Sequence, residues 1–217
     1  MNSTLIPRVL GAGILLLSAA GLAMYGQPDL EAKWTFLAPE YESRLTHREV
    51  FIDPAELLHL MNDDYIELII YDVRDERDWN VFHLVDAERI LLEALPTQRK
   101  RLRALSGLGV VVIVSNDEIL ATEAWKQLMA LAKPNAYILE GGLNHWLNIY
   151  GVHEDESETH DVAADLSQPD GTLRHPFRLA LGARHAAARP DEHIAPQREY
   201  TPQVKLLKKV AKAGGCD

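Results

Sequence analysis

Apolar residues from position 47 onward follow two alternating patterns, short continuous runs and helically spaced positions. The runs predict strands at residues 50–52, 66–71, 87–90, 109–114 and 136–139. The run at 109–114 holds five β-branched residues in succession, which favours a strand buried on both faces. The helical spacing predicts helices at residues 53–61, 96–105, 118–132 and 142–149, the first with Asp53 as N-cap and Pro54 in its first turn. This alternation predicts an α/β fold, a parallel sheet with helices on both faces.

A different pattern occupies the N-terminus, where no charge occurs between Arg8 and Asp29. Residues 9–26 are almost wholly apolar and long enough to cross a bilayer. We expect residues 1–26 to be a single-pass transmembrane anchor in contact with lipid; the alternative is a cleaved signal peptide with a small-residue site at 21–23. The positive N-terminus and Arg8 place the bulk of the chain on the outside. The expected location is the bacterial inner membrane, with the globular part in the periplasm.

Two segments flank the predicted domain at 47–152. Residues 27–46, which contain two prolines, are predicted to be a stalk. Residues 153–217 are predicted to be a tail that runs extended over the domain or a neighbour and ends in a basic helix at about 202–213. That helix would begin at Thr201 and Pro202, and its lysines form one stripe: Lys205, Lys208, Lys209 and Lys212. The stripe is interpreted either as a solvated face or as a contact for anionic lipid or an acidic partner.

Composition narrows the function classes. Apolar residues make up 47% of the chain and charged residues 25%, the balance of a globular protein. The net charge of −10 argues against nucleic acid as a partner. The single cysteine, Cys216, excludes an internal disulfide and a Cys-rich metal site. The histidines show no metal-ligand spacing, so we expect neither a cofactor nor a metal.

Four stretches carry a family resemblance. Residues 52–57 read Ile-Asp-Pro-Ala-Glu-Leu, residues 71–74 read Tyr-Asp-Val-Arg, His83 precedes Ala87 and Ile90, and residues 139–146 read Leu-Glu-Gly-Gly-Leu-Asn-His-Trp. Together they resemble the rhodanese-like domains over about residues 47–152. The resemblance implies a rhodanese-like parallel sheet and an active-site loop after the strand at 109–114. It also implies that Arg74 is an ion-pair partner and His83 a hydrogen-bonded part of the scaffold.

The sequence departs from the family at that loop. Active members have a cysteine that carries a persulfide, followed by a loop whose backbone amides and arginine hold an anion. Here the cysteine position is Ser115 and the arginine position is Leu120. A serine hydroxyl forms no persulfide, and carboxylates in the loop oppose an anion. The degenerate loop comprises Ser115, Asn116, Asp117, Glu118, Ile119 and Leu120.

The same residues also match a capping box, in which the Ser115 side chain caps the next helix and the Glu118 side chain reaches back to the Ser115 backbone amide. The other interpretation of the loop is a repurposed anion or metal pocket. The acidic residues after the second strand are interpreted as solvated or paired rather than metal-binding; they are Asp72, Asp75, Glu76 and Asp78. Trp125 and Trp146 are predicted core residues.

These observations favour a membrane-anchored, catalytically inactive rhodanese-like domain that binds other protein subunits of a membrane or periplasmic assembly. The alternative is a sulfur-handling protein that uses Cys216, a thiol preceded by two glycines and near lysines that would lower its pKa. A third hypothesis is an anion-sensing domain without turnover.

Overall fold

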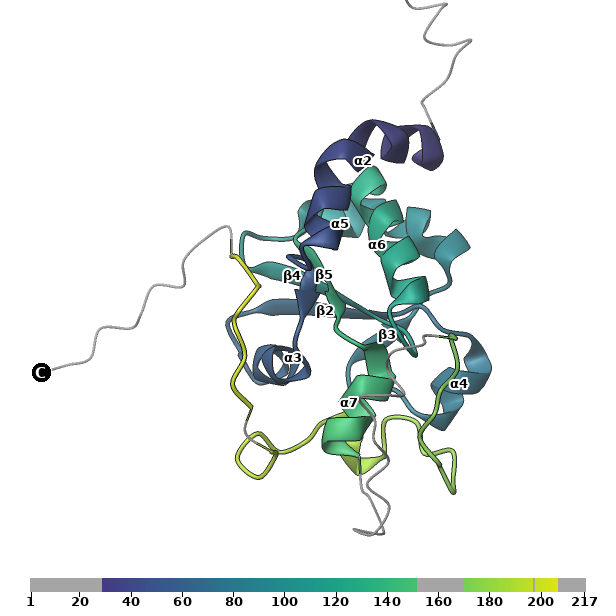
Figure 1. Ribbon diagram of the computed structural model, residues 1–217, viewed down its shortest axis with the longest axis vertical. Helices are drawn as coiled ribbons and strands as arrows, with labels where there is room; N and C mark the ends of the chain where they lie inside the picture. Colours follow the sequence, from purple (N-terminus) through teal and green to yellow (C-terminus); the bar gives the residue numbers. More distant parts are fainter. Residues whose placement is uncertain (1–28, 152–169, 197, 207–217) are drawn as a thin grey trace, which may run out of the picture.

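A computed structural model of the chain describes residues 29–151, 170–196 and 198–206 (Figure 1). The predicted membrane segment at 9–26 lies outside these residues. Within the described ranges, no helix is long and apolar enough to cross a membrane.

Five parallel strands form one sheet in the order β1-β5-β4-β2-β3. The strands are β1 (Phe51–Ile52), β2 (Glu67–Asp72), β3 (Ala87–Arg89), β4 (Gly109–Val114) and β5 (Ala136–Leu139). All six residues of β4 are buried, because the strand lies in the middle of the sheet with helices on both faces. The predicted parallel α/β sheet is therefore confirmed, with each strand within a residue or two of its expected place.

Helices cover the sheet in two layers (Figure 1). The layer above the sheet in that view, called the upper layer, contains α2 (Leu30–Thr46), η1 (Leu92–Gln98), α5 (Arg99–Ala104) and α6 (Ile119–Leu131). The layer below, the lower layer, contains α3 (Pro54–Met61), α7 (Gly142–Tyr150) and the described part of the tail, residues 170–196 and 198–206, with η2 (Ala186–Ala188). The helix predicted at 96–105 is divided between η1 and α5. Helix α4 (Glu76–Val81) has no counterpart in the prediction.

The segment predicted as a stalk is instead helix α2, which packs on the domain. Asp29 caps it by accepting a hydrogen bond from the Ala32 amide at 2.7 Å. Trp34 and Tyr41 then make edge contacts with the buried ring of Trp125, at centroid distances of 6.2 and 5.8 Å. The prolines concealed this helix: Pro28 precedes it, and Pro39 lies inside it despite the usual cost. The free energy gained by packing the apolar side of α2 on the domain exceeds the cost of the backbone hydrogen bond that Pro39 cannot donate.

The described part of the tail packs on the sheet and helices of the lower layer, in agreement with the predicted course over the domain. The ring of Phe177 stacks on Phe82 at 5.6 Å, and the indole of Trp146 donates to the Ala187 carbonyl at 2.7 Å. The predicted helix start at Thr201 and Pro202 is wrong, because residues 201–206 contain no helix. The amides of Gln203 and Val204 instead donate to the buried carboxylate of Glu56 at 2.9–3.0 Å.

Candidate functional site: the loop after β4

The loop at residues 115–118 lies at the carboxyl end of β4, the edge where parallel α/β sheets place their sites. Its first residue, Ser115, is only 1% exposed. The Ser115 hydroxyl donates to the Asp117 carbonyl at 2.5 Å and accepts from the Ala121 amide at 3.1 Å. The first bond closes the loop on itself and the second joins the loop to the first turn of α6 (Ile119–Leu131), so both hydrogen-bonding roles of the hydroxyl are used within the protein.

The predicted capping box is wrong. Helix α6 begins at Ile119, and its N-cap residue Glu118 makes no capping hydrogen bond. The Ile119 amide donates instead to the Asp117 carboxylate at 2.8 Å. The Glu118 carboxylate points elsewhere and accepts from Arg48 and from the Gly141 amide, both at 2.7 Å. Ser115 is therefore not the N-cap residue, although its hydroxyl accepts from the amide of Ala121 in the first turn of α6.

Arg74 donates to Asn116 of this loop and is confirmed as an ion-pair partner, here of Asp72. Its buried guanidinium makes a paired contact with Asp72, the shortest distance being 2.6 Å. It also donates to the Phe82 carbonyl at 2.6 Å and to the Asn116 Oδ1 at 3.0 Å. Because these bonds engage each of its nitrogens, Arg74 holds the loop to β2 and is not presented to a ligand.

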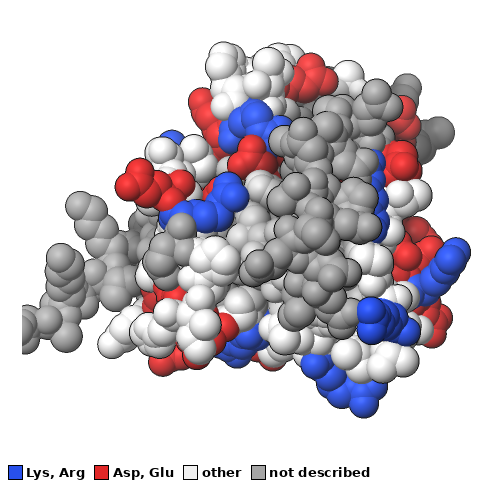
Figure 2. Space-filling model, turned by 60° about the horizontal axis from the view of Figure 1, so that its bottom comes forward, with Lys and Arg blue, Asp and Glu red and all other residues white. Residues whose placement is uncertain are grey.

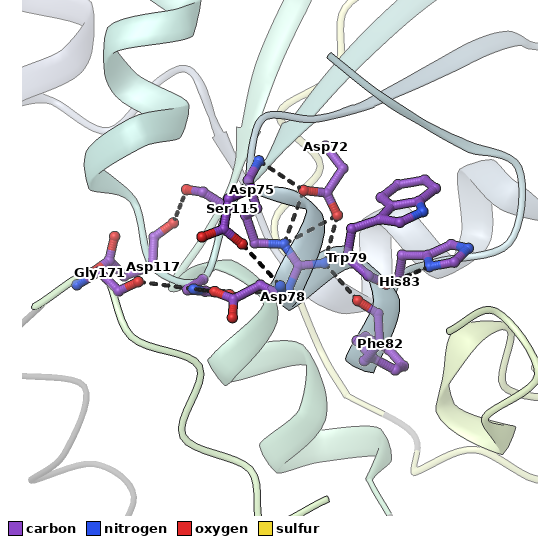
Figure 3. Close-up of polar contacts among 11 residues, drawn as sticks. Asp72, Asp75, Asp78, Trp79, Phe82, His83, Ser115, Asp117 and Gly171 are labelled. Carbon is purple, nitrogen blue, oxygen red and sulfur yellow. Dashed lines mark hydrogen bonds and ion pairs between the residues drawn. The ribbon is translucent and has the colours of Figure 1, made fainter. Parts of the chain in front are cut away.

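The tail covers the other side of the loop. The Asn116 amide group donates to the Gly171 carbonyl at 2.8 Å and to the Asp78 carboxylate (Figure 3). In return the Gly171 amide donates to the Asp117 carboxylate at 2.7 Å. Asn144 of α7 holds the next residues, donating to the Thr172 carbonyl and accepting from the Arg174 amide. Asn116 and Asp117 are therefore buried by a segment more than 50 positions away.

The two glycines of the family-like stretch at residues 139–146 allow α7 to approach this loop. Both Gly141 and Gly142 have positive φ, at 67° and 63°. A Cβ on Gly142 would lie 2.6–2.7 Å from the carbonyl oxygens of Asp117 and Asn116, so only glycine fits. The first amides of α7 then donate to the loop, Leu143 to the Ser115 carbonyl and Asn144 to the Asn116 carbonyl. The amides at this helix start are thus used within the protein.

A pocket of about 300 Å³ lies beside the loop. Its charged lining comprises Arg48, Asp117, Glu118, Glu140, His145 and Arg174. Arg48 contacts Glu118 at 2.7 Å and Glu140 at 3.0 Å, and its hydrogen bond with Glu118 raises its pKa. With its carboxylates outnumbering its arginines, this pocket does not resemble an anion cradle. On the lower face, acidic and basic side chains are likewise interspersed (Figure 2).

Three of the four acidic residues in and after β2 are engaged in structural contacts, and the fourth, Glu76, is exposed. Asp72 pairs with Arg74, and Asp75 caps α4 by accepting from the Asp78 amide at 2.9 Å. Across the described ranges, no group of three or more His, Cys, Asp or Glu residues is arranged to hold a metal. The Nδ1 of His83 donates to the Trp79 carbonyl at 2.8 Å, and its imidazole stacks on the Trp79 ring at a centroid distance of 3.7 Å, as expected of a scaffold residue. Trp125 and Trp146 are fully buried, as predicted.

The candidate site in the C-terminal segment falls almost wholly outside the described residues. Only Lys205 is described, exposed on an extended segment whose amide donates to the Tyr137 hydroxyl at 2.9 Å. Lys208, Lys209, Lys212 and Cys216 lie beyond it, so the lysine stripe and the thiol stay predictions.

Sequence reasoning missed three residues that shape the loop, namely Arg48, Asn144 and Gly171. The Asp170-Gly171 pair is a turn signal, and it was the available hint that the tail changes direction there. Arg48 and Asn144 gave no local signal, because their partners are 70 and 28 positions away.

Residues 53–149 match the family model described as Rhodanese-like domain. No curated protein matches the chain.

Among solved structures, a Bacillus halodurans protein aligns with 22% identity and a TM-score of 0.40, over 49% of this chain and 77% of that one. A Lactobacillus plantarum protein aligns with 20% identity and a TM-score of 0.40, over 51% and 92%. A rhodanese-like domain protein from Staphylococcus aureus aligns with 21% identity and a TM-score of 0.36, over 44% and 89%.

Proposed function

Because residues 53–149 are a rhodanese-like domain, we propose that this chain is a catalytically inactive member of that family which serves as a binding and structural module. In this proposal the N-terminal segment anchors the module in the bacterial inner membrane, and the domain faces the periplasm. There it contacts other protein subunits of a membrane assembly.

The observation that carries the inactivity is the state of Ser115. A sulfur-transfer nucleophile has to ionise, hold a second sulfur and be reached by a donor. Ser115 carries oxygen rather than sulfur, so it neither ionises readily nor holds a second sulfur. It is also only 1% exposed, in a loop that the tail covers. These contacts support a loop that maintains the fold rather than one that turns over substrate.

The residues at the mouth of the loop support protein contact over anion binding. Ile119 and Leu120 are 46% and 39% exposed, although both are large and apolar. Leu120 occupies the position at which the family resemblance implies an arginine. Exposed apolar side chains of this kind are more useful to a protein partner than to an anion.

The activity test uses the full chain purified in detergent, with thiosulfate as sulfur donor and cyanide as acceptor. We expect no thiocyanate above the enzyme-free rate for the natural chain. We also expect none for Ser115→Cys, because the tail still covers the loop and Leu120 supplies no cation. Ser106→Cys, which adds a thiol at an exposed loop position, is the matched control for unspecific thiol chemistry.

Two results would contradict the proposal. Turnover by the natural chain that disappears in Ser115→Ala would show that the loop is active. Turnover that disappears instead in Cys216→Ser would favour the sulfur-handling alternative.

The location is tested separately, by alkaline carbonate extraction of membranes and by protease added to spheroplasts. We expect the chain to stay in the membrane pellet and residues beyond about 30 to be digested from outside. Digestion only after lysis would place the domain in the cytoplasm. Release of the chain by carbonate would contradict the proposed membrane anchor.

A further inference from the structure

The pocket beside the loop after β4 is built from separate parts of the chain that hydrogen bonds hold together. Its described lining comprises Arg48, Asp117, Glu118, Glu140, Gly141, Asn144, His145 and Arg174. Bonds join the turn before β1 to the loop, the loop to the turn after β5, and α7 to the tail. The volume of about 300 Å³ lies at the lower end of the range for ligand pockets and suits one long side chain.

Both arginines of the lining already contact carboxylates. The guanidinium of Arg48 donates to Glu118 at 2.7 and 3.0 Å and to Glu140 at 3.0 Å. Arg174 contacts Asp170 at 3.3 Å. An anion that entered the pocket would therefore compete with these carboxylates for the arginines.

Acceptors of the lining, by contrast, have unused capacity. The Asp117 carboxylate is 7% exposed and accepts one amide hydrogen bond at each oxygen, from Ile119 and Gly171, although a carboxylate offers about four acceptor positions. Within the described part of the chain, no cation contacts Asp117, so this buried negative charge lacks the partner that such charges normally have. The Glu140 carboxylate donates nothing and accepts from Arg48 at Oε1 alone.

His145 adds a third acceptor. Its Nδ1 donates to the Glu140 carbonyl at 3.0 Å, so the Nε2 of the neutral ring is an acceptor. Two carboxylates and an imidazole nitrogen around one pocket suit a guanidinium, which has five N–H donors in one plane and no acceptor. The chemistry of the pocket therefore favours an arginine side chain as its occupant.

Apolar side chains directly follow the pocket in the chain. Helix α6 begins at Ile119, the residue after Glu118, and Ile119 and Leu120 are 46% and 39% exposed. A small free cation gains nothing from these side chains, whereas a protein segment covers charged and apolar surface in one contact. The combination indicates a protein partner.

We propose that the pocket receives an arginine side chain of a partner protein, whose guanidinium hydrogen-bonds the acceptors of the pocket and whose neighbouring apolar residues cover Ile119 and Leu120. This inference rests on the proposed function, because it gives the chemistry of the partner that the binding module holds. The guanidinium compensates the buried charge of Asp117, and its hydrogen bonds to carboxylates are stronger than those between neutral groups.

The experiment measures how far an arginine peptide shields the pocket of the full chain in detergent. The probe is acetyl-Gly-Leu-Arg-Leu-Gly-amide, which has no amine or carboxylate of its own. The control peptide carries citrulline, an uncharged analogue of arginine, at its centre. Exposed carboxylates are coupled to glycinamide with a carbodiimide, and mass spectrometry follows the yield at Glu140, whose side chain is 40% exposed.

At about 5 mM arginine peptide, a concentration suited to one weak contact, we expect coupling at Glu140 to fall about twofold or more. The citrulline peptide should leave that coupling unchanged. Exposed Glu93 of η1 is the internal control and should react equally with and without either peptide.

Two variants locate the contact. Leu120→Arg adds a cation beside the pocket and should abolish the protection of Glu140, because like charges repel. Its matched control is Ile194→Arg, the same change at a tail residue that is 81% exposed and follows residues 191–193 near the end of α3. This control should keep the protection. Asp117→Asn removes the buried charge and should weaken the protection; if it does not fold, the exposed Leu120→Arg still tests the contact.

The outcomes separate this inference from the proposed function. Equal Glu140 coupling with and without the arginine peptide, in a chain that forms no thiocyanate, overturns the arginine site and leaves the inactive binding module standing. Equal protection by the citrulline peptide overturns the site too, because it would show an apolar contact alone. Protection lost in Ile194→Arg as well as in Leu120→Arg would show general charge repulsion and overturn the location. Thiocyanate formation that depends on Ser115 overturns the proposed function and this inference together.

Discussion

The upper and lower layers bury the two faces of one sheet by different means. The upper layer uses apolar packing between regular helices, centred on Trp125 with Trp34 and Tyr41 around it. The lower layer uses two short helices and an irregular tail. The irregular tail pairs only some of its backbone groups within itself, and side chains of the domain accept hydrogen bonds from others, as Glu56 does from Gln203 and Val204.

This difference teaches that the tail is a component of the domain rather than an appendage. The indole of Trp146, the hydroxyl of Tyr137 and the amide of Asn144 each bond to a tail backbone group. The loop after β4 belongs to the same system, since Asn116 and Asp117 bind Gly171. The loop after β4 is therefore covered in part by the chain's own tail.

The largest expected effect contrasts one tryptophan from each layer. Trp125→Ala and Trp146→Ala both empty fully buried sites and should each lower the free energy of unfolding by about 3–5 kcal/mol. Only Trp146→Ala should also expose the tail to protease under native conditions, because its indole holds Ala187. Denaturant titration and limited proteolysis measure the two effects. Equal tail cleavage in both variants would remove the distinction between the layers.

A smaller effect is expected at Glu56. Glu56→Gln weakens hydrogen bonds that two tail amides donate to a buried carboxylate, worth about 1.5–3 kcal/mol for bonds to a charged group. Hydrogen–deuterium exchange should rise at residues 203–206 and stay unchanged in α6. Glu93→Gln, an exposed change in η1, is the control. Unaltered exchange at 203–206 would mean that apolar contacts alone hold the tail end.

Ser115→Ala tests the loop where the two layers meet. It removes the donor to the Asp117 carbonyl and the acceptor for the buried Ala121 amide, at an expected cost of about 1–2 kcal/mol. Ser106→Ala, at an exposed position, should cost well under about 1 kcal/mol in the same denaturation experiment. A neutral Ser115→Ala would show that the loop keeps its shape without the hydroxyl.

The smallest effect concerns pH and His185 of the tail. Burial lowers the pKa of His185, whose Nδ1 accepts from the Ala187 amide. The unfolded chain therefore binds the proton more tightly than the folded one, so this contribution is complete above the unfolded pKa and is lost as pH falls through the folded pKa. Exchange at residues 186–188, corrected for its intrinsic pH dependence, should rise between about pH 7.5 and pH 5.

His185→Asn is the control for that pH effect, since asparagine keeps an acceptor without titrating in this range. It should flatten the pH dependence of exchange at residues 186–188. A natural-chain slope that persists in His185→Asn would assign the effect to other groups.

Local pattern predicted most of the domain and missed helices α2 and α4. The strands at 109–114 and 136–139 were predicted to the residue, because continuous apolar runs bounded by turn residues have few alternatives. Helix α2 was missed since Pro28 and Pro39 outweighed the helical spacing of Trp34, Leu37 and Tyr41. That spacing becomes a recognisable packing face only once the fold places Trp125 opposite it.

At the candidate site, the sequence by itself determined that position 115 has no thiol and position 120 no positive charge, since residue identity fixes both. Only the tertiary structure decided how the loop is closed and where the tail lies. The deciding bonds, from Gly171 to Asp117 and from Gln203 to Glu56, join positions 54 and 147 residues apart. Such contacts follow no local periodicity, because a backbone amide of any residue can donate them.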